Sequence, residues 1–139
     1  MLIIAHDLPK EQRACNKEES VPLILVVDDD PEILEINCEV FTKQGYSIVT
    51  AKDGEEALDV YARTKPDLIC TDLIMPNLGG MEMAEILREH DATVPIILVT
   101  GARDEVISGD NDVFNAIFYK PYVHEELADA ARLIFEGLG

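Results

Sequence analysis

Five short aliphatic runs, separated by longer stretches with helical periodicity, constrain the fold of this chain more than any other feature. The runs are rich in β-branched residues and too short for typical helices, which favours strands buried on both faces of a sheet. They lie at residues 23–27, 46–50, 68–72, 95–100 and 116–119. Strands that alternate with helices form right-handed βαβ units around a parallel sheet. The pattern therefore predicts an α/β fold, with a doubly wound, five-stranded parallel sheet and helices on both faces.

The helices between these runs are predicted from their terminal residues. Asp30 suits an N-cap, Pro31 suits the first helical position, and Gly45 suits the position just past the last turn. Pro66 ends the second helix, because the residue before a proline is biased away from helical geometry. The predicted helices cover about residues 31–44, 53–65, 81–90 and 125–136.

The composition indicates an acidic globular protein. Its 139 residues include 11 Lys and Arg against 28 Asp and Glu, which gives a net charge of −17. This charge argues against nucleic acid or an anionic membrane as the main partner, and it favours divalent cations or basic protein surfaces. The three cysteines have no paired spacing, which indicates free thiols in a reducing compartment. No apolar run approaches the roughly 18 residues of a membrane span. We therefore expect a cytoplasmic protein.

The chain is predicted to contain a single folded domain. Residues 1–21 are mostly polar and lack a sustained hydrophobic period, so we expect a flexible leader there and the folded domain at residues 22–139. The chain ends directly after the last predicted helix. We therefore expect no attached output domain, and an output that works through protein contacts.

Polar residues stand at the carboxyl ends of four of the five predicted strands: Asp28 and Asp29, then Asp72, Thr100 and Lys120. Parallel strands share this edge, where α/β proteins bind ligands, so the five side chains are expected to converge. Clustered carboxylates repel one another unless a cation neutralises them, and an oxygen-only ligand set suits Mg²⁺. An ammonium group and a hydroxyl beside such a metal are typical of a phosphoryl site, in which one carboxylate can be the nucleophile.

These motifs resemble the receiver domain of the two-component response-regulator family over about residues 22–137. Each matching piece is weak alone, but all occur in the order and spacing of that family. The pieces are Leu25-Val26-Val27-Asp28-Asp29-Asp30, Thr71-Asp72-Leu73-Ile74-Met75-Pro76, Val99-Thr100 and Lys120-Pro121.

The resemblance implies a flavodoxin-like sheet and a Mg²⁺ site beside the phosphoacceptor. Asp72 would accept the phosphoryl group. Asp29, Asp72 and the backbone carbonyl of Ile74 would bind Mg²⁺, with Asp28 acting through water. 

The resemblance also implies roles for the last two site residues and a place in signalling. Thr100 would contact the phosphoryl group, and Lys120 would pair with the acceptor and then with the phosphate, before a cis Lys120-Pro121 bond. The donor would be a phosphohistidine on a sensor histidine kinase or a histidine phosphotransfer protein. The chain would then be a phosphoprotein of a two-component system or phosphorelay. It would act on a downstream protein target and would not be an enzyme beyond catalysing its own phosphorylation and dephosphorylation.

Two features depart from the family pattern. The position three residues before the lysine, usually Tyr or Phe, holds Ile117, and the aromatic residues follow as Phe118 and Tyr119. The helical stretch at 104–107 is followed by helix breakers at 108–111, so the fourth helix of the fold is expected to be short or irregular. Since this region is normally part of the output face, the manner of signalling is expected to be unusual.

Two other functions fit parts of the sequence. Phosphatases that form an aspartyl phosphate also carry Asp-x-Asp after the first strand, as in Asp28-Asp29-Asp30, but Pro31-Glu32 does not fit their usual continuation. The alternative that stays open is a receiver-like interaction module that works without phosphorylation, because the usual aromatic residue is missing. The intact set of site residues favours phosphorylation.

Overall fold

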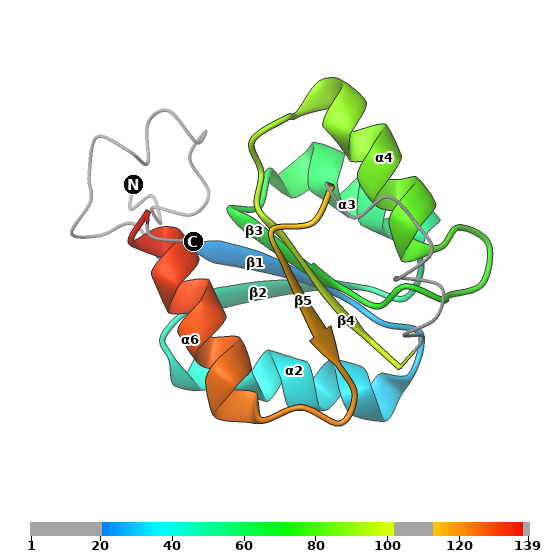
Figure 1. Ribbon diagram of the computed structural model, residues 1–139. Coiled ribbons are helices and arrows are strands. Elements are labelled where there is room, and N and C mark those ends of the chain that lie inside the picture. The colour runs from blue at the N-terminus through cyan, green and yellow to red at the C-terminus, as the bar shows by residue number, and fades with distance from the viewer. Residues whose placement is uncertain (1–20, 102–112, 138–139) are drawn as a thin grey trace, which may run out of the picture.

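A parallel five-stranded sheet forms the centre of the molecule (Figure 1). The structure is a computed structural model, and it describes residues 21–101 and 113–137. The sheet order is β2-β1-β3-β4-β5. The strands are β1 (Leu23–Val27), β2 (Ser47–Ala51), β3 (Leu68–Thr71), β4 (Ile96–Thr100) and β5 (Ala116–Tyr119). The predicted doubly wound sheet is confirmed, and each strand end lies within one residue of its predicted position.

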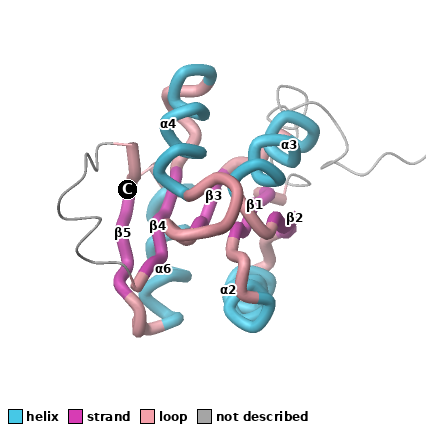
Figure 2. The backbone as a smooth tube through the Cα atoms, turned by 90° about the vertical axis from the view of Figure 1, so that its right-hand side faces the viewer, coloured by secondary structure: helices cyan, strands magenta, loops and turns pink. Residues whose placement is uncertain are grey.

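Four helices of the described ranges cover the two faces of the sheet: α2 (Pro31–Lys43), α3 (Gly54–Thr64), α4 (Gly80–His90) and α6 (His124–Phe135). Helices α2 and α6 lie side by side on one face, and α3 and α4 lie on the other (Figures 1 and 2). None of the helices in residues 21–101 and 113–137 has the length and apolar character needed to cross a membrane.

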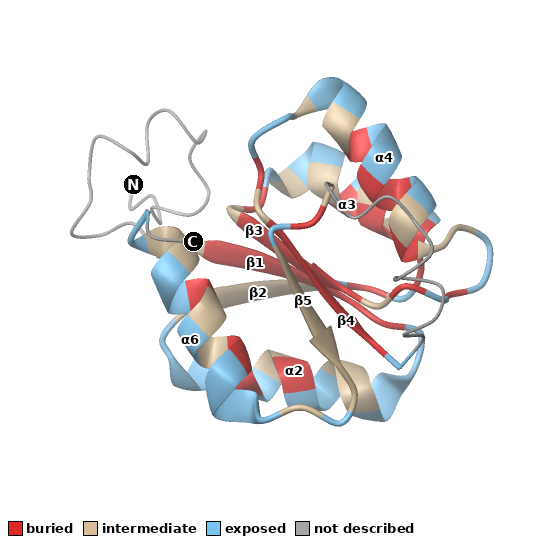
Figure 3. Ribbon diagram, viewed as in Figure 1, coloured by how far each residue is buried: buried red, intermediate tan, exposed pale blue. Residues whose placement is uncertain are grey.

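Alternate strand residues enter two separate hydrophobic cores, as the two-residue period of a strand requires. Leu25 and Val27 of β1 belong to the core shared with α3 and α4, whereas Ile24 and Val26 belong to the core shared with α2 and α6. Figure 3 shows the central strands as buried and the outer faces of the helices as exposed. Because both faces are covered, the central strands β1 and β4 are aliphatic at nearly every position, which explains why the sequence shows continuous runs there without polar alternation.

The helix termini follow the predicted signals. The Asp30 side chain accepts a hydrogen bond from the Glu32 amide at 2.9 Å, and Pro31 opens α2. Gly45 adopts a left-handed φ of 93° past the end of α2. The predicted leader and the predicted irregular helix after Thr100 fall on residues 1–20 and 102–112, outside the described residues.

Candidate functional site

The sheet order brings the predicted site residues to one edge of the molecule. Strand β3 lies between β1 and β4, so its carboxyl end adjoins both. The Asp72 amide donates to the Val27 carbonyl at 3.0 Å, which fixes Asp72 beside the end of β1. The Lys120 amide donates to the Thr100 carbonyl at 2.8 Å, which fixes Lys120 beside the end of β4.

Three carboxylates cluster at this edge. Asp28, Asp29 and Asp72 each offer an oxygen, and these oxygens all lie within 4.8 Å of one another. Asp28 is buried at 2% exposure, Asp29 is exposed, and Asp72 is intermediate. Backbone amides hold two of them in place, because Asp28 Oδ1 accepts from the Asp30 amide at 2.9 Å and Asp72 Oδ1 accepts from the Leu73 amide at 2.7 Å. The cluster is therefore formed and oriented by the protein itself.

The environment of Asp28 disfavours its negative charge. Burial raises the pKa of this carboxyl above its usual value, and the charges of Asp72 and Asp29 raise it further. The Asp30 amide and Lys120 partly offset these effects. Ionised Asp28 therefore costs folding free energy at neutral pH, and a bound cation would relieve that cost.

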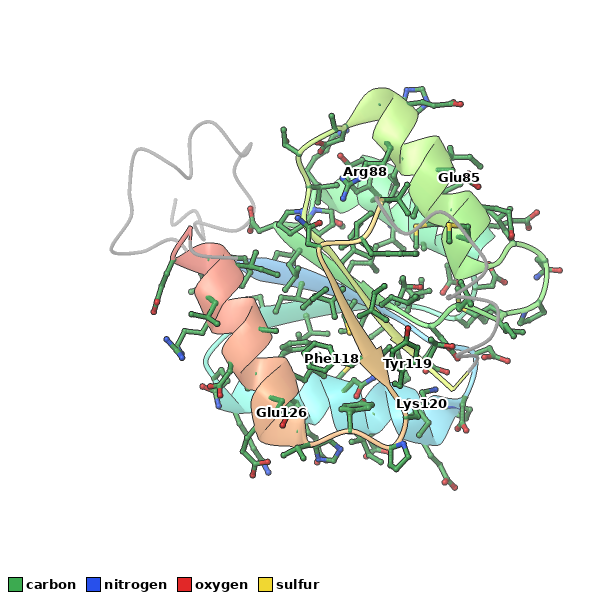
Figure 4. The ribbon with its side chains drawn as sticks, viewed as in Figure 1. Glu85, Arg88, Phe118, Tyr119, Lys120 and Glu126 are labelled. Carbon is green, nitrogen blue, oxygen red and sulfur yellow. The ribbon has the colours of Figure 1, made fainter. Side chains whose placement is uncertain are left out.

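Lys120 places a positive charge against the acids. Its Nζ lies 3.4 Å from Asp72 Oδ2 and 3.6 Å from Asp28 Oδ2. Figure 4 shows Lys120 at the carboxyl end of β5, and the Lys120-Pro121 bond that follows is cis, as predicted. Thr100 is buried at the last position of β4, opposite Tyr119 of β5 in the sheet register. All five predicted side chains thus belong to the same edge of the sheet.

The loop after β3 carries Ile74, the sixth predicted site residue. The Ile74 side chain is 59% exposed, and its carbonyl accepts no backbone hydrogen bond from the described residues. The loop itself is anchored at both ends, since the Gly80 amide donates to the Leu73 carbonyl at 2.7 Å and the Gly54 amide donates to the Leu78 carbonyl at 2.8 Å.

Residues that the sequence pattern does not single out also support the site. Asn77 has a left-handed φ of 67° and donates to the buried Asp53 side chain at 2.9 Å, which joins the β3–α4 loop to the start of α3. Tyr122, just past Lys120, donates from its hydroxyl to Asn37 of α2. The sequence carries one signal for this contact: Asn37 stands among the apolar positions of α2. A buried amide there needs a hydrogen-bond partner.

Strand β5, which ends one residue before Lys120, carries the residues that depart from the usual aromatic pattern. Ile117 packs in the core shared with α3 and α4, and Tyr119 packs in the same core two residues nearer the site. Phe118 points to the opposite core, where its ring lies 6.4 Å from that of Tyr122. The aromatic residues of β5 are therefore divided between the two faces of the sheet.

Comparison with known proteins agrees with the fold and the residue pattern. The model of the response regulator receiver domain family matches residues 24–132. The response regulator MprA of Mycobacterium sp. (strain KMS) is 38% identical over 114 residues, which cover 80% of this chain and 49% of that protein. The hybrid signal transduction histidine kinase D of Dictyostelium discoideum is 39% identical over 121 residues, which cover 81% of this chain and 7% of the kinase. The chain thus spans about half the length of the MprA relatives that it matches.

Solved structures show the same architecture. The response regulator TrrA of Thermotoga maritima, in complex with Mg²⁺-BeF, has a TM-score of 0.76 and 32% identity, and the match covers 81% of this chain and 97% of that one. The receiver domain of a Francisella response regulator has a TM-score of 0.77 and 28% identity, with coverage of 85% and 99%. On the family match, the sequence identity and the shared fold, this chain belongs to the response regulator receiver domain family of two-component signalling.

Proposed function

We propose that this protein accepts a phosphoryl group on Asp72 from a phosphohistidine of a sensor histidine kinase or histidine phosphotransfer protein, and that it signals through protein contacts. The observation that carries the proposal is the position of the Asp72 carboxylate, beside both the two acids that follow β1 and the Lys120 ammonium group that follows β5. Free thiols at Cys38 and Cys70 are in keeping with a cytoplasmic site of action.

The donor set fits Mg²⁺, the cation that receiver domains use. Three carboxylates lie within 4.8 Å of one another, and the buried one carries a pKa raised by burial and by its acidic neighbours. We infer that Asp29, Asp72 and the Ile74 carbonyl hold the ion, with Asp28 acting through water. The Thermotoga relative, which is in complex with Mg²⁺-BeF, supports Mg²⁺ as the ion. A bound Mg²⁺ would neutralise the carboxylates and the charge of the incoming phosphoryl group.

The chemical step is an in-line displacement at phosphorus. A carboxylate oxygen of Asp72 forms the new P–O bond while the P–N bond to the donor histidine breaks, and the leaving imidazole takes up a proton. Lys120 stands 3.4 Å from Asp72 Oδ2, where it stabilises the negative oxygens of the transferred group. The Thr100 hydroxyl, at the end of the neighbouring strand, is a hydrogen-bond donor for the same oxygens. The contribution of the protein is positioning and charge neutralisation.

Incubation with acetyl phosphate and Mg²⁺ tests this function without knowledge of the natural donor. We expect an adduct of about 80 Da in the intact mass, located by peptide mapping at Asp72. No adduct should form when the cation is chelated before acetyl phosphate is added. An absence of adduct on a folded protein that binds Mg²⁺ would contradict the proposal. It would instead favour a receiver-like interaction module that works without phosphorylation.

A cation should stabilise the wild-type protein more than an Asp28→Asn variant. Without divalent cations at pH 7, we expect the variant to unfold at a higher temperature, because the charge of Asp28 is disfavoured in the folded state. The sign follows from linkage: a carboxyl with a raised folded pKa loses stability as pH rises above its unfolded pKa. With free Mg²⁺ at about 100 times its dissociation constant, wild type should gain about 2.7 kcal/mol.

The variant should gain less from the same Mg²⁺ concentration, so the difference in unfolding temperature should shrink or reverse. Thermal unfolding with chelator and with Mg²⁺ measures both quantities. An equal gain for the two proteins would show that Asp28 takes no part in binding the cation.

A further inference from the structure

We propose that the hydrogen bond from the Tyr122 hydroxyl to Asn37 is a latch that positions Lys120 for the reaction at Asp72. The inference rests on the proposed function, and it assigns Tyr122 and Asn37 as positioning residues that act through Lys120.

The chain after β5 has few other constraints near Lys120. The lysine amide is bonded to Thr100, but its ammonium group must extend past the end of the strand to reach Asp72 at 3.4 Å and Asp28 at 3.6 Å. Pro121 donates no hydrogen bond, and Val123 is 51% exposed. The Val123 carbonyl accepts from the Glu126 and Leu127 amides, which ties the connection to α6. Among the described residues between Lys120 and α6, Tyr122 is the one whose side chain bonds the connection to α2.

The partly buried ring of Tyr122 lies near two other aromatic rings. It lies 6.4 Å from the ring of Phe118 and 5.6 Å from that of His124, and it belongs to the core between the sheet and helices α2 and α6. Aromatic contacts of this kind limit the positions that the ring can adopt. The hydroxyl then points to α2, where it donates to the Asn37 side-chain oxygen.

Asn37 is an unusual residue for its position. It is 2% exposed and lies on the same helix as the buried Val40 and Phe41. A buried amide without a partner destabilises a protein, whereas an apolar residue of similar size would not. A packing role alone would favour leucine here. The amide instead provides an acceptor for Tyr122, which is what a specific anchor requires.

The latch joins two parts of the site that the sheet keeps apart. Strands β1 and β5 are not neighbours, because β3 and β4 lie between them. Helix α2 begins directly after the acidic residues that follow β1, and Tyr122 lies two residues past the lysine that follows β5. The hydrogen bond therefore sets the position of the lysine relative to the acids across the width of three strands.

Tyr122→Phe removes the hydroxyl alone and is the first test. Labelling of amines followed by peptide mass spectrometry should show Lys120 reacting about fivefold faster, while the exposed Lys43 and Lys52 react at the wild-type rate. Uptake of phosphoryl groups from acetyl phosphate should slow by about the same factor. Tyr46→Phe is the matched control, because Tyr46 packs against Phe135 at 5.0 Å on another part of the same face and should change neither rate.

The double variant Asn37→Leu with Tyr122→Phe separates positioning from stability. Replacing both partners by apolar groups should restore most of the unfolding free energy lost in Tyr122→Phe. The double variant can therefore be measured even if the single variant fails to fold. Faster labelling and slower phosphorylation should nevertheless persist. Wild-type values of both in the double variant would overturn the proposal, as would faster labelling with phosphorylation unchanged. If wild type takes up no phosphoryl group, the proposed function fails, but the labelling rates still decide whether the latch holds Lys120.

Discussion

A protein in which Asp72 is replaced by asparagine is expected to take up no phosphoryl group from acetyl phosphate. Asparagine keeps the size of the side chain and the oxygen that accepts the Leu73 amide at 2.7 Å. It replaces the negative carboxylate by an amide, whose lone pairs are delocalised and which cannot form the acyl phosphate. Intact mass should therefore show no adduct under conditions in which wild type is fully modified.

The fold of this variant should be preserved, so that the loss can be assigned to chemistry. Lys120 keeps Asp28 as a partner at 3.6 Å, and we expect the free energy of unfolding to change by no more than about 1 kcal/mol. Asp59→Asn is a matched control: Asp59 lies on the exposed face of α3, paired with Arg63 at 3.3 Å, and its variant should be modified like wild type. An adduct of wild-type stoichiometry on Asp72→Asn would place the acceptor elsewhere.

The architecture was predictable because burial on both faces leaves a strong signal. A central parallel strand must be apolar at every position, and a polar residue can stand only where the strand ends. Leu23–Val27 followed by Asp28 shows this directly, and the strand and its boundary agree with the structure. The edge on which Asp72 and Lys120 meet follows from the parallel direction of the strands, which alternation with helices already implies.

The contacts that hold the site were not predictable in the same way. Tyr122 and Asn37 are 85 positions apart, and neither belongs to a motif whose spacing indicates a partner. Asn77 and Asp53 are 24 positions apart, and their bond depends on a left-handed residue in a loop. Such pairs require the relative placement of helices and loops. Periodicity does not contain that information, since it reports only which face of each element is buried.

Gly80 is a further residue whose role could not be predicted from the sequence. The sequence predicts a helix over about residues 81–90, whereas the structure makes Gly80 the first residue of α4. A Cβ atom at this position would lie 2.1 Å from the backbone oxygen of Asp72 and 3.2 Å from the Leu73 Cα. The glycine is therefore required by the close approach of the helix to the backbone of the proposed acceptor.

Gly80→Ala should accordingly have two effects: it should destabilise the protein, and it should displace Asp72. The atom that the new methyl group meets is a backbone oxygen, which cannot move aside as the end of a side chain can. We expect a loss of at least about 3 kcal/mol of unfolding free energy, at the upper end of overpacking effects. We also expect slower phosphoryl uptake by whatever fraction remains folded. Urea denaturation measures the first quantity, and the acetyl phosphate assay measures the second.

Gly101→Ala is the control. It tests whether the destabilisation of Gly80→Ala comes from the lack of space for a methyl group or simply from the loss of a glycine. A Cβ at Gly101 would meet nothing within 4 Å of the described structure, although this residue directly follows Thr100 at the same edge of the sheet. Its unfolding free energy should stay within about 0.5 kcal/mol of wild type. If both variants unfold at the wild-type urea concentration, the backbone of the acceptor strand is free to yield to α4. The rigid placement of Asp72 that the phosphoryl reaction needs must then come from its hydrogen bonds with Val27, Leu73 and Lys120.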